Sequence, residues 1–185
     1  TFTYTRMQLS GNINLSFNAK FIEKENYLNI DYDNLFNGRL NISWSPNQAF
    51  SLGAGIGGGR QIAYNETNPR IGISQRRGVD LDLQAKGKFQ WSLDLDYEEM
   101  YELYDPAISI YKGFLFQSVF KYTLTRAFDF RLVSQLNNFD SGEINILMQP
   151  LIQYRPTAFS LFYLGGMFQN GQFQGYLKWQ KQIGN

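Results

Sequence analysis

The sequence predicts an all-β protein: an antiparallel, up-and-down transmembrane β-barrel of about ten strands, or the C-terminal part of a larger barrel. Three observations predict it. Apolar and polar residues alternate with period two, tight turns alternate with longer loops, and aromatic residues make up 17% of the chain. Residues 89–97 show the alternation, with Phe, Trp, Leu, Leu and Tyr on one face and Gln, Ser, Asp and Asp on the other. Because a helix repeats every 3.6 residues, only a strand fits this pattern.

Ten strand-like stretches follow one another along the chain. Apolar residues are odd-numbered in the first, from Met7 to Phe21, and even-numbered in the second, which is one long strand or two short ones. Most stretches reach the roughly 9–11 residues that a membrane-crossing strand needs. They cover residues 7–21, 27–45, 50–56, 79–85, 89–100, 111–124, 127–138, 144–155, 158–168 and 174–183.

The connections between these stretches alternate between short and long. Residues suited to tight turns occur at 45–48, 87–88, 125–126 and 156–157. Longer loops are expected at 22–26, 61–77, 101–110, 139–143 and 169–173. Short turns at one end and longer loops at the other are typical of outer-membrane barrels. This arrangement predicts an even strand count, with both termini at the end that carries the tight turns.

Composition excludes several classes of function. The chain has 185 residues, a net charge of +1 and neither Cys nor His. The near-zero charge argues against a nucleic-acid partner. The missing His and Cys exclude Ser-His and Cys-His catalysis and metal sites built from those ligands. A mean hydropathy of −0.35 predicts no helical membrane span. We therefore expect a protein that is not an enzyme and that has no cofactor.

The alternation leaves two orientations open. In an outer-membrane barrel the apolar face meets lipid, whereas in a soluble, lipocalin-like ligand-binding barrel it lines the interior. The many rings favour the membrane, because the interior of a small barrel would struggle to hold them. Several aromatic residues also lie near strand ends, where an interfacial girdle is expected: Trp44, Phe89, Tyr97, Tyr122, Phe128 and Tyr154.

The hairpin formed by residues 78–86 and 89–100 carries four acidic residues on its polar face. If it turns at Gly87 and Lys88, Asp82 faces Asp94 and Asp80 faces Asp96. Facing like charges need counter-charges, and Lys121 and Arg131 lie at a similar height on the next strands. The expected role is a lumen charge network that neutralises and stiffens the barrel. A cation site and a pair of glycosidase acids are the alternatives.

The glycine-rich run and the loops carry weaker signals. Residues 53–59 read GAGIGGG and end in Arg60 on a strand, without the helix and the Gly-Lys-Ser/Thr ending of a phosphate-binding loop. Small lumen-facing residues that make room for a neighbouring segment are the expected role. The 101–110 loop combines Tyr and acidic residues that suit sugar rings, and the 61–77 loop is the longest. Plain solvated loops are the alternative for both.

Several segments resemble a known bacterial family. They are residues 112–116 (KGFLF), 121–138 (KYTLTRAFDFRLVSQLNN), 149–156 (QPLIQYRP), 162–165 (FYLG) and 177–180 (LKWQ), with 38–51 more loosely similar. The chain resembles the C-terminal barrel, a domain of unknown function, of large Gram-negative outer-membrane proteins with an N-terminal family-9-type carbohydrate-binding domain. The resemblance implies location in the bacterial outer membrane and outer-membrane lipid as a partner. It also implies other outer-membrane or periplasmic protein partners, and a link to glycan binding or uptake through that other domain. The expected role is a membrane anchor, scaffold or porin-like pore.

Overall fold

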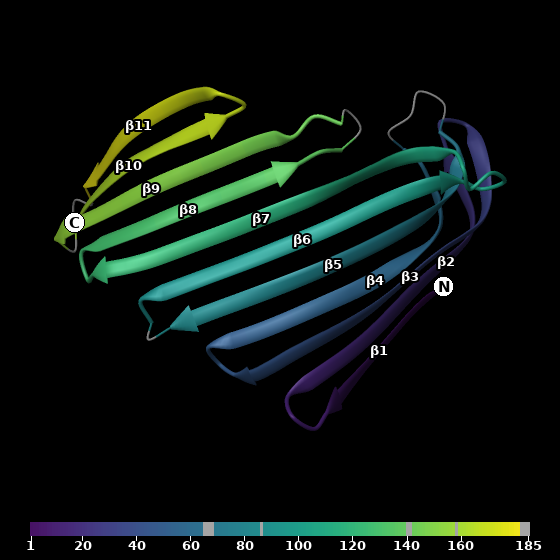
Figure 1. Cartoon of the computed structure of the whole chain (residues 1–185), viewed down its shortest axis with the longest axis horizontal. Helices are drawn as coiled ribbons and strands as arrows, with labels where there is room; N and C mark the ends of the chain where they lie inside the picture. Colours follow the sequence, from purple (N-terminus) through teal and green to yellow (C-terminus); the bar gives the residue numbers. More distant parts are fainter. Residues whose placement is uncertain (65–68, 86, 140–141, 158, 182–185) are drawn as a thin grey trace.

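The computed structural model describes residues 1–64, 69–85, 87–139, 142–157 and 159–181. They form one antiparallel sheet of eleven strands, in which each strand pairs with the next along the chain (Figure 1). The strands are β1 (Phe2–Leu9), β2 (Ile13–Tyr27), β3 (Ile30–Asn47), β4 (Phe50–Ile62), β5 (Ile71–Ala85), β6 (Phe89–Glu102), β7 (Ser109–Thr125), β8 (Phe128–Asn137), β9 (Asn145–Thr157), β10 (Ser160–Gln169) and β11 (Gln172–Lys181). The predicted all-β, up-and-down arrangement is confirmed.

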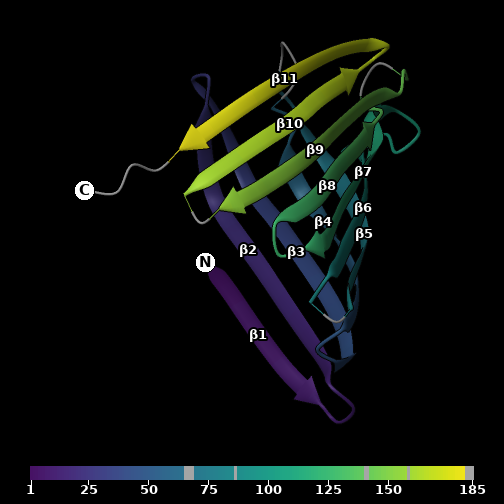
Figure 2. The ribbon, with the colours of Figure 1, turned by 90° about the vertical axis from the view of Figure 1, so that its left-hand side faces the viewer.

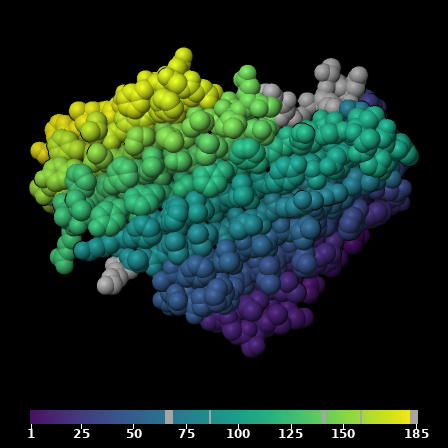
Figure 3. Space-filling model, viewed as in Figure 1, coloured from purple at the N-terminus to yellow at the C-terminus, as the bar shows by residue number. Residues whose placement is uncertain are grey.

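The sheet is curled but open. Among the described strands, β1 and β11 each have a single neighbour. Figure 2 shows both edge strands on one side of the molecule and the central strands β5, β6 and β7 on the other. In the space-filling view, side chains of successive strands form a continuous surface (Figure 3). Within the described part of the chain, no helix has the length and apolarity needed to cross a membrane.

The strand count differs from the predicted ten because the stretch 7–21 is two strands. The chain turns at residues 10–12, where Gly11 and Asn12 have φ angles of 77° and 61°, and Leu9 pairs with Ile13. A turn of three residues keeps the odd-numbered residues on the same face, so the alternation runs through it unbroken. The stretch 27–45, in contrast, belongs mainly to the single strand β3, which continues through Asn34 despite its φ of 57°.

An odd number of strands places the start of β1 and the end of β11 at opposite ends of the sheet, which contradicts the prediction that the chain enters and leaves the sheet at one end (Figure 1). We call the end where β1 joins β2 the turn end and the opposite end the loop end. Two of the predicted loops are also wrong. Residues 22–26 lie within β2, and the 169–173 segment contains only a tight turn at Asn170 and Gly171, both with positive φ.

The sheet curves toward its polar face. Arg39 on β3 reaches Asp96 on β6, with 4.0 Å between the guanidinium and the carboxylate. These strands are three positions apart, about 14 Å on a flat sheet. Curvature toward the polar side shortens that span, so the polar face is concave and the apolar face convex.

The buried core is small and lies at the loop end. Tyr32, Leu35 and Ile62 form it, and the Tyr32 hydroxyl donates a hydrogen bond of 2.6 Å to the carbonyl oxygen of Pro69. Beside it, the Tyr64 hydroxyl donates to the Glu25 carboxylate at 2.7 Å. Loss of surrounding water, together with this hydrogen bond, raises the pKa of Tyr64 to about 12. These contacts tie the connection after β4 to the β2–β3 hairpin.

Glycines on β4 allow close approach between strands. A Cβ added at Gly57 would lie 2.7 Å from the backbone oxygen of Gly38 and 3.1 Å from the Cβ of Arg39. The first neighbour is backbone and cannot rotate away. A Cβ added at Gly38 on the adjacent strand would instead meet a ring carbon of Phe36 at 3.3 Å, and that ring can move.

We predict that Gly57→Ala destabilises the sheet by about 1–3 kcal/mol, the usual cost of overpacking. Urea unfolding followed by circular dichroism measures the change. Gly38→Ala is the matched control and is expected to change the free energy of unfolding by much less. Equal effects of the two substitutions would contradict the role given to the backbone contact.

Candidate functional site

The acidic hairpin lies on the polar face as predicted, but in a different register. Asp80 faces Asp94, Asp82 faces Ser92, and Asp96 faces Gly78. The predicted pairs, Asp82 with Asp94 and Asp80 with Asp96, were therefore wrong. The turn is centred on Gly87, which has a φ of 66°, and the Lys88 amide donates to the carbonyl oxygen of Ala85. Glycine adopts this conformation without strain, and it moves every cross-strand pair by two residues.

The counter-charges that reach the acidic hairpin are Arg76 on β5 and Arg39 on β3, and both approach Asp96. Arg76 donates two hydrogen bonds to Asp96, of 3.3 Å from Nε and 3.2 Å from Nη2. Arg39 extends over Gly55 and Gly78 toward the same carboxylate, and its Nε donates to the Asn41 amide oxygen at 2.8 Å. Two guanidinium groups thus converge on Asp96. Such paired, charge-assisted hydrogen bonds are the stronger kind.

The predicted cations lie elsewhere on the polar face. Lys121 on β7 faces Arg131 on β8, and Lys121 faces Gln90 on β6. The row that contains Gln90, Lys121 and Arg131 lies four residues along β6 from the pair of Asp80 and Asp94, toward the turn end. Within the described residues, neither Lys121 nor Arg131 forms an ion pair. The structure therefore does not join these two cations to the four acids.

Sequence reasoning missed Arg39 and Arg76 for an identifiable reason. Arg76 lies in the segment 61–77, which was interpreted as a loop but is partly strand β5. Its even number places it on the same face as Asp80 and Asp82, so extending the β5 alternation by two residues would have found it. Arg39 fits the polar parity of its own strand, but only the curvature of the sheet brings it to Asp96.

Three of the four hairpin acids form no ion pair with any residue that the structure describes. Asp80, Asp82 and Asp94 are exposed on the concave face, with Asp80 lying over Gly53 and facing Asp94. Among the described residues, no three side chains of His, Cys, Asp or Glu are arranged to hold a metal ion. The acids give this face a local negative charge beside the Arg39–Arg76–Asp96 network.

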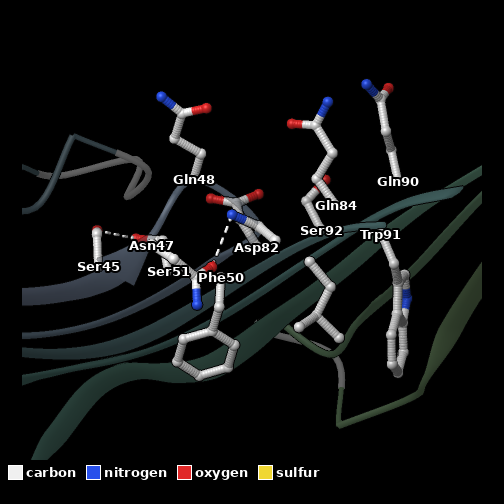
Figure 4. A pocket seen from close by; sticks show the side chains of 12 residues that line it. Ser45, Asn47, Gln48, Phe50, Ser51, Asp82, Gln84, Gln90, Trp91 and Ser92 are labelled. Carbon is white, nitrogen blue, oxygen red and sulfur yellow. Dashed lines mark hydrogen bonds between the residues drawn. The ribbon is translucent and has the colours of Figure 1, made fainter. Parts of the chain in front are cut away.

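The polar and apolar faces stay separate to the end of the strands. At the turn end, Figure 4 shows Gln48, Gln84 and Gln90 on one side of the sheet and Phe50 and Trp91 on the other. A hollow of about 440 Å³ lies among these residues. The Ser45 and Ser51 hydroxyls share a hydrogen bond of 2.9 Å there. The amide side chains are suited to contact with water, and the rings to an apolar medium.

Rings on the apolar face meet one another near the turn end, in a row that we call the aromatic belt. Ring centroids lie 5.7 Å apart for Trp44 and Phe50, and 6.1 Å apart for Phe162 and Trp179. Contacts of this kind are favourable beyond the area they bury. The belt consists of three groups of contacting rings on strands between β3 and β11: Trp44 and Phe50; Phe89, Phe120 and Phe130; and Phe128, Tyr154, Phe162 and Trp179. Tyr97, predicted for a girdle, donates instead to Glu99 toward the loop end.

Between the aromatic belt and the loop end, large side chains of the apolar face are exposed. Leu177 is 75% exposed, Ile56 is 58% exposed and Leu164 is 55% exposed. Every substantial contact between described strands joins neighbours in the sheet, so no second layer covers this face. On the same face Arg77 pairs with Glu99 at 3.7 Å, which marks where the apolar band gives way to charge toward the loop end.

Comparison with models of known protein families and with curated proteins finds no match for this chain. What the protein does must therefore be inferred from the two faces of its sheet.

We predict opposite effects for two neighbouring acids. Asp96→Asn should destabilise the sheet by about 0.5–1 kcal/mol, because two guanidinium groups lose their partner. Asp94→Asn should be neutral or stabilising, because it removes the repulsion from the facing Asp80.

Urea unfolding at low and high salt measures both effects, and salt should reduce the difference between them. A larger loss of stability for Asp94→Asn than for Asp96→Asn would refute this assignment of partners.

Proposed function

We propose that the chain is part of a non-catalytic outer-membrane β-barrel that acts as a membrane anchor, scaffold or pore. In this proposal the convex apolar face meets the acyl chains and the concave polar face lines a lumen. The observation that carries it is the exposed apolar face bordered by the aromatic belt. Aromatic girdles at the interface and an outward apolar band are the features of membrane barrels.

The large exposed apolar area supports the proposal that this face lies in lipid rather than in water. Burying one large apolar side chain is worth about 1.5–3 kcal/mol, and this face carries one at nearly every outward position of its central strands. Soluble monomers rarely expose contiguous apolar patches of more than a few hundred Å². A lipid phase would remove this cost without any further protein layer.

The height of the apolar band is consistent with a bilayer. On β6 the band runs from Phe89 to Tyr97, which is about 27 Å along the strand. At the usual strand tilt of about 40° it would span about 21 Å, near the 25 Å or so typical of such barrels. Arg77 and Glu99 lie just beyond this band.

The direction of curvature favours this proposal over a soluble, lipocalin-like barrel. A lipocalin-like barrel would curve toward its apolar face and enclose the rings. Here the ion pair between Arg39 and Asp96 spans the inside of the curve, and the belt lies on the outside. The suggested link to glycan binding and to other outer-membrane or periplasmic proteins rests on the family resemblance of residues 112–180.

We predict that the three tryptophans, Trp44, Trp91 and Trp179, report an interfacial depth in lipid vesicles. All three lie on the apolar face toward the turn end. Lipids brominated near the headgroup should quench their fluorescence more strongly than lipids brominated near the chain ends.

The control replaces all three tryptophans by Phe and adds Gln117→Trp on the polar face. Aqueous iodide, rather than brominated lipid, should quench that residue. The membrane proposal would be disproved if the protein stayed in solution without detergent and brominated lipid did not quench its tryptophan fluorescence.

The proposal also concerns how the barrel closes. In an up-and-down sheet of eleven strands, β1 and β11 run in the same direction. A closed, fully antiparallel barrel has an even number of strands. We therefore propose that an odd number of further strands lies between β1 and β11 in the closed barrel.

Cysteine cross-linking tests this closure, because the chain has no native cysteine. Oxidation should join Met7→Cys to Leu15→Cys, which are direct partners on β1 and β2. Single cysteines along β1 combined with single cysteines along β11 should stay unlinked in the inserted protein. Efficient disulfide formation between β1 and β11 would show instead that these strands close the barrel alone.

A further inference from the structure

A hollow of about 400 Å³ lies across the strands β8 to β11. Most of the side chains that line it belong to the polar face by register, and no acid is among the described residues of its lining. Volumes of this order suit small organic ligands. The hollow combines one cation, amides and apolar surface, and its lining includes Arg131, Val133, Gln149, Leu151, Met167 and Tyr176.

The cation of this hollow, Arg131, has a second cation beside it. It faces Lys121 on β7, which places the two Cβ atoms about 5 Å apart. Lys121 also faces Gln90, which Figure 4 shows on the polar side of the sheet, so both cations lie on the concave face. Asp129 lies on the same face two residues before Arg131, but its carboxylate accepts a hydrogen bond of 2.6 Å from the Thr123 hydroxyl. Facing like charges are unfavourable, and a bound anion would supply the counter-charge.

Apolar surface continues from the cations toward β11. Leu151 on β9 faces Arg131, and Val133 lies on the same face two residues after Arg131. Leu151 in turn faces Gly165 on β10, which has no side chain to fill the space. The Tyr176 ring lies over this glycine, since a Cβ added at Gly165 would be 2.6 Å from the tyrosine hydroxyl oxygen. Because β8 and β10 are two strand positions apart, about 10 Å, the hollow has cations at one end and a hydroxyl at the other.

We propose that this hollow binds a small organic anion from water. Arg131 and Lys121 hold its oxyanion group, and its apolar body packs on Val133 and Leu151. A guanidinium and an ammonium group suit carboxylate and phosphate oxygens. The Tyr176 hydroxyl can donate to a second polar group of the ligand. The site goes beyond the role of anchor, scaffold or pore, and it follows from the concave face alone, whether or not that face lines a lumen in a membrane.

Isothermal titration of the detergent-purified chain with hexanoate and with phenyl phosphate, corrected for protein-free micelles, tests this site. The Lys121→Gln, Arg131→Gln double variant should bind both anions at least about tenfold more weakly, which corresponds to the loss of one charge-assisted hydrogen bond. The Arg6→Gln, Lys20→Gln double variant is the matched control. It removes two cations from the polar face of β1 and β2 and should bind as the parent does. Circular dichroism checks that each variant folds.

Two further measurements separate the charged end of the ligand from its apolar body. Hexanol has the body of hexanoate without the charge, and it should bind at least about tenfold more weakly than hexanoate. Leu151→Asn should weaken the binding of hexanoate more than that of inorganic phosphate. Equal affinities in all variants, hexanol binding as tight as that of hexanoate, or no binding of either soluble anion would overturn the site. Binding only to vesicles that contain phosphatidylglycerol would also overturn it, because the ligand would then be a lipid.

Discussion

The pleat of the strands is the constraint on which the rest of this structure depends. Successive side chains point to opposite faces, and cross-strand hydrogen bonds hold the eleven strands in register except for shifts near the ends of some strands. Each row across the sheet therefore stays on one side. A slip of one residue at a single hairpin would place a strand's carboxylates among the rings. The separation of the two faces, and every functional inference from it, follows from this register.

Curvature turns the two faces into different environments. On the concave side, polar side chains converge, and glycines such as Gly55 and Gly78 leave room for the Arg39 guanidinium to lie across them. The charge network around Asp96 forms because of that convergence. On the convex side, side chains diverge, so large rings can stand beside one another without a second layer. The same curve thus concentrates charge inside and spreads apolar surface outside.

The two ends of the sheet differ as much as its faces do. The turn end carries the aromatic belt and short connections. The loop end carries the small core around Tyr32 and Leu35 and the longer connections. The edges add a further asymmetry, since β1 and β11 present unpaired backbone groups that a closed sheet would satisfy. The proposed barrel segment would account for these features.

The alternation in the sequence by itself determined the fold class, the positions of most strands and the face on which each acid lies, because side-chain parity is a local property of the backbone. It could not reveal the turn at Gly11, since a three-residue turn preserves parity. It also could not set the pairing of Asp80 with Asp94, which depends on where the chain reverses at Gly87. Only the tertiary structure decided that Arg39 joins Arg76 at Asp96, and that Lys121 and Arg131 pair with none of the four acids in the described residues. The reason is physical: a side chain of β3 reaches one of β6 only across β4 and β5, in the curvature of a whole sheet, and no local pattern of residues encodes that approach.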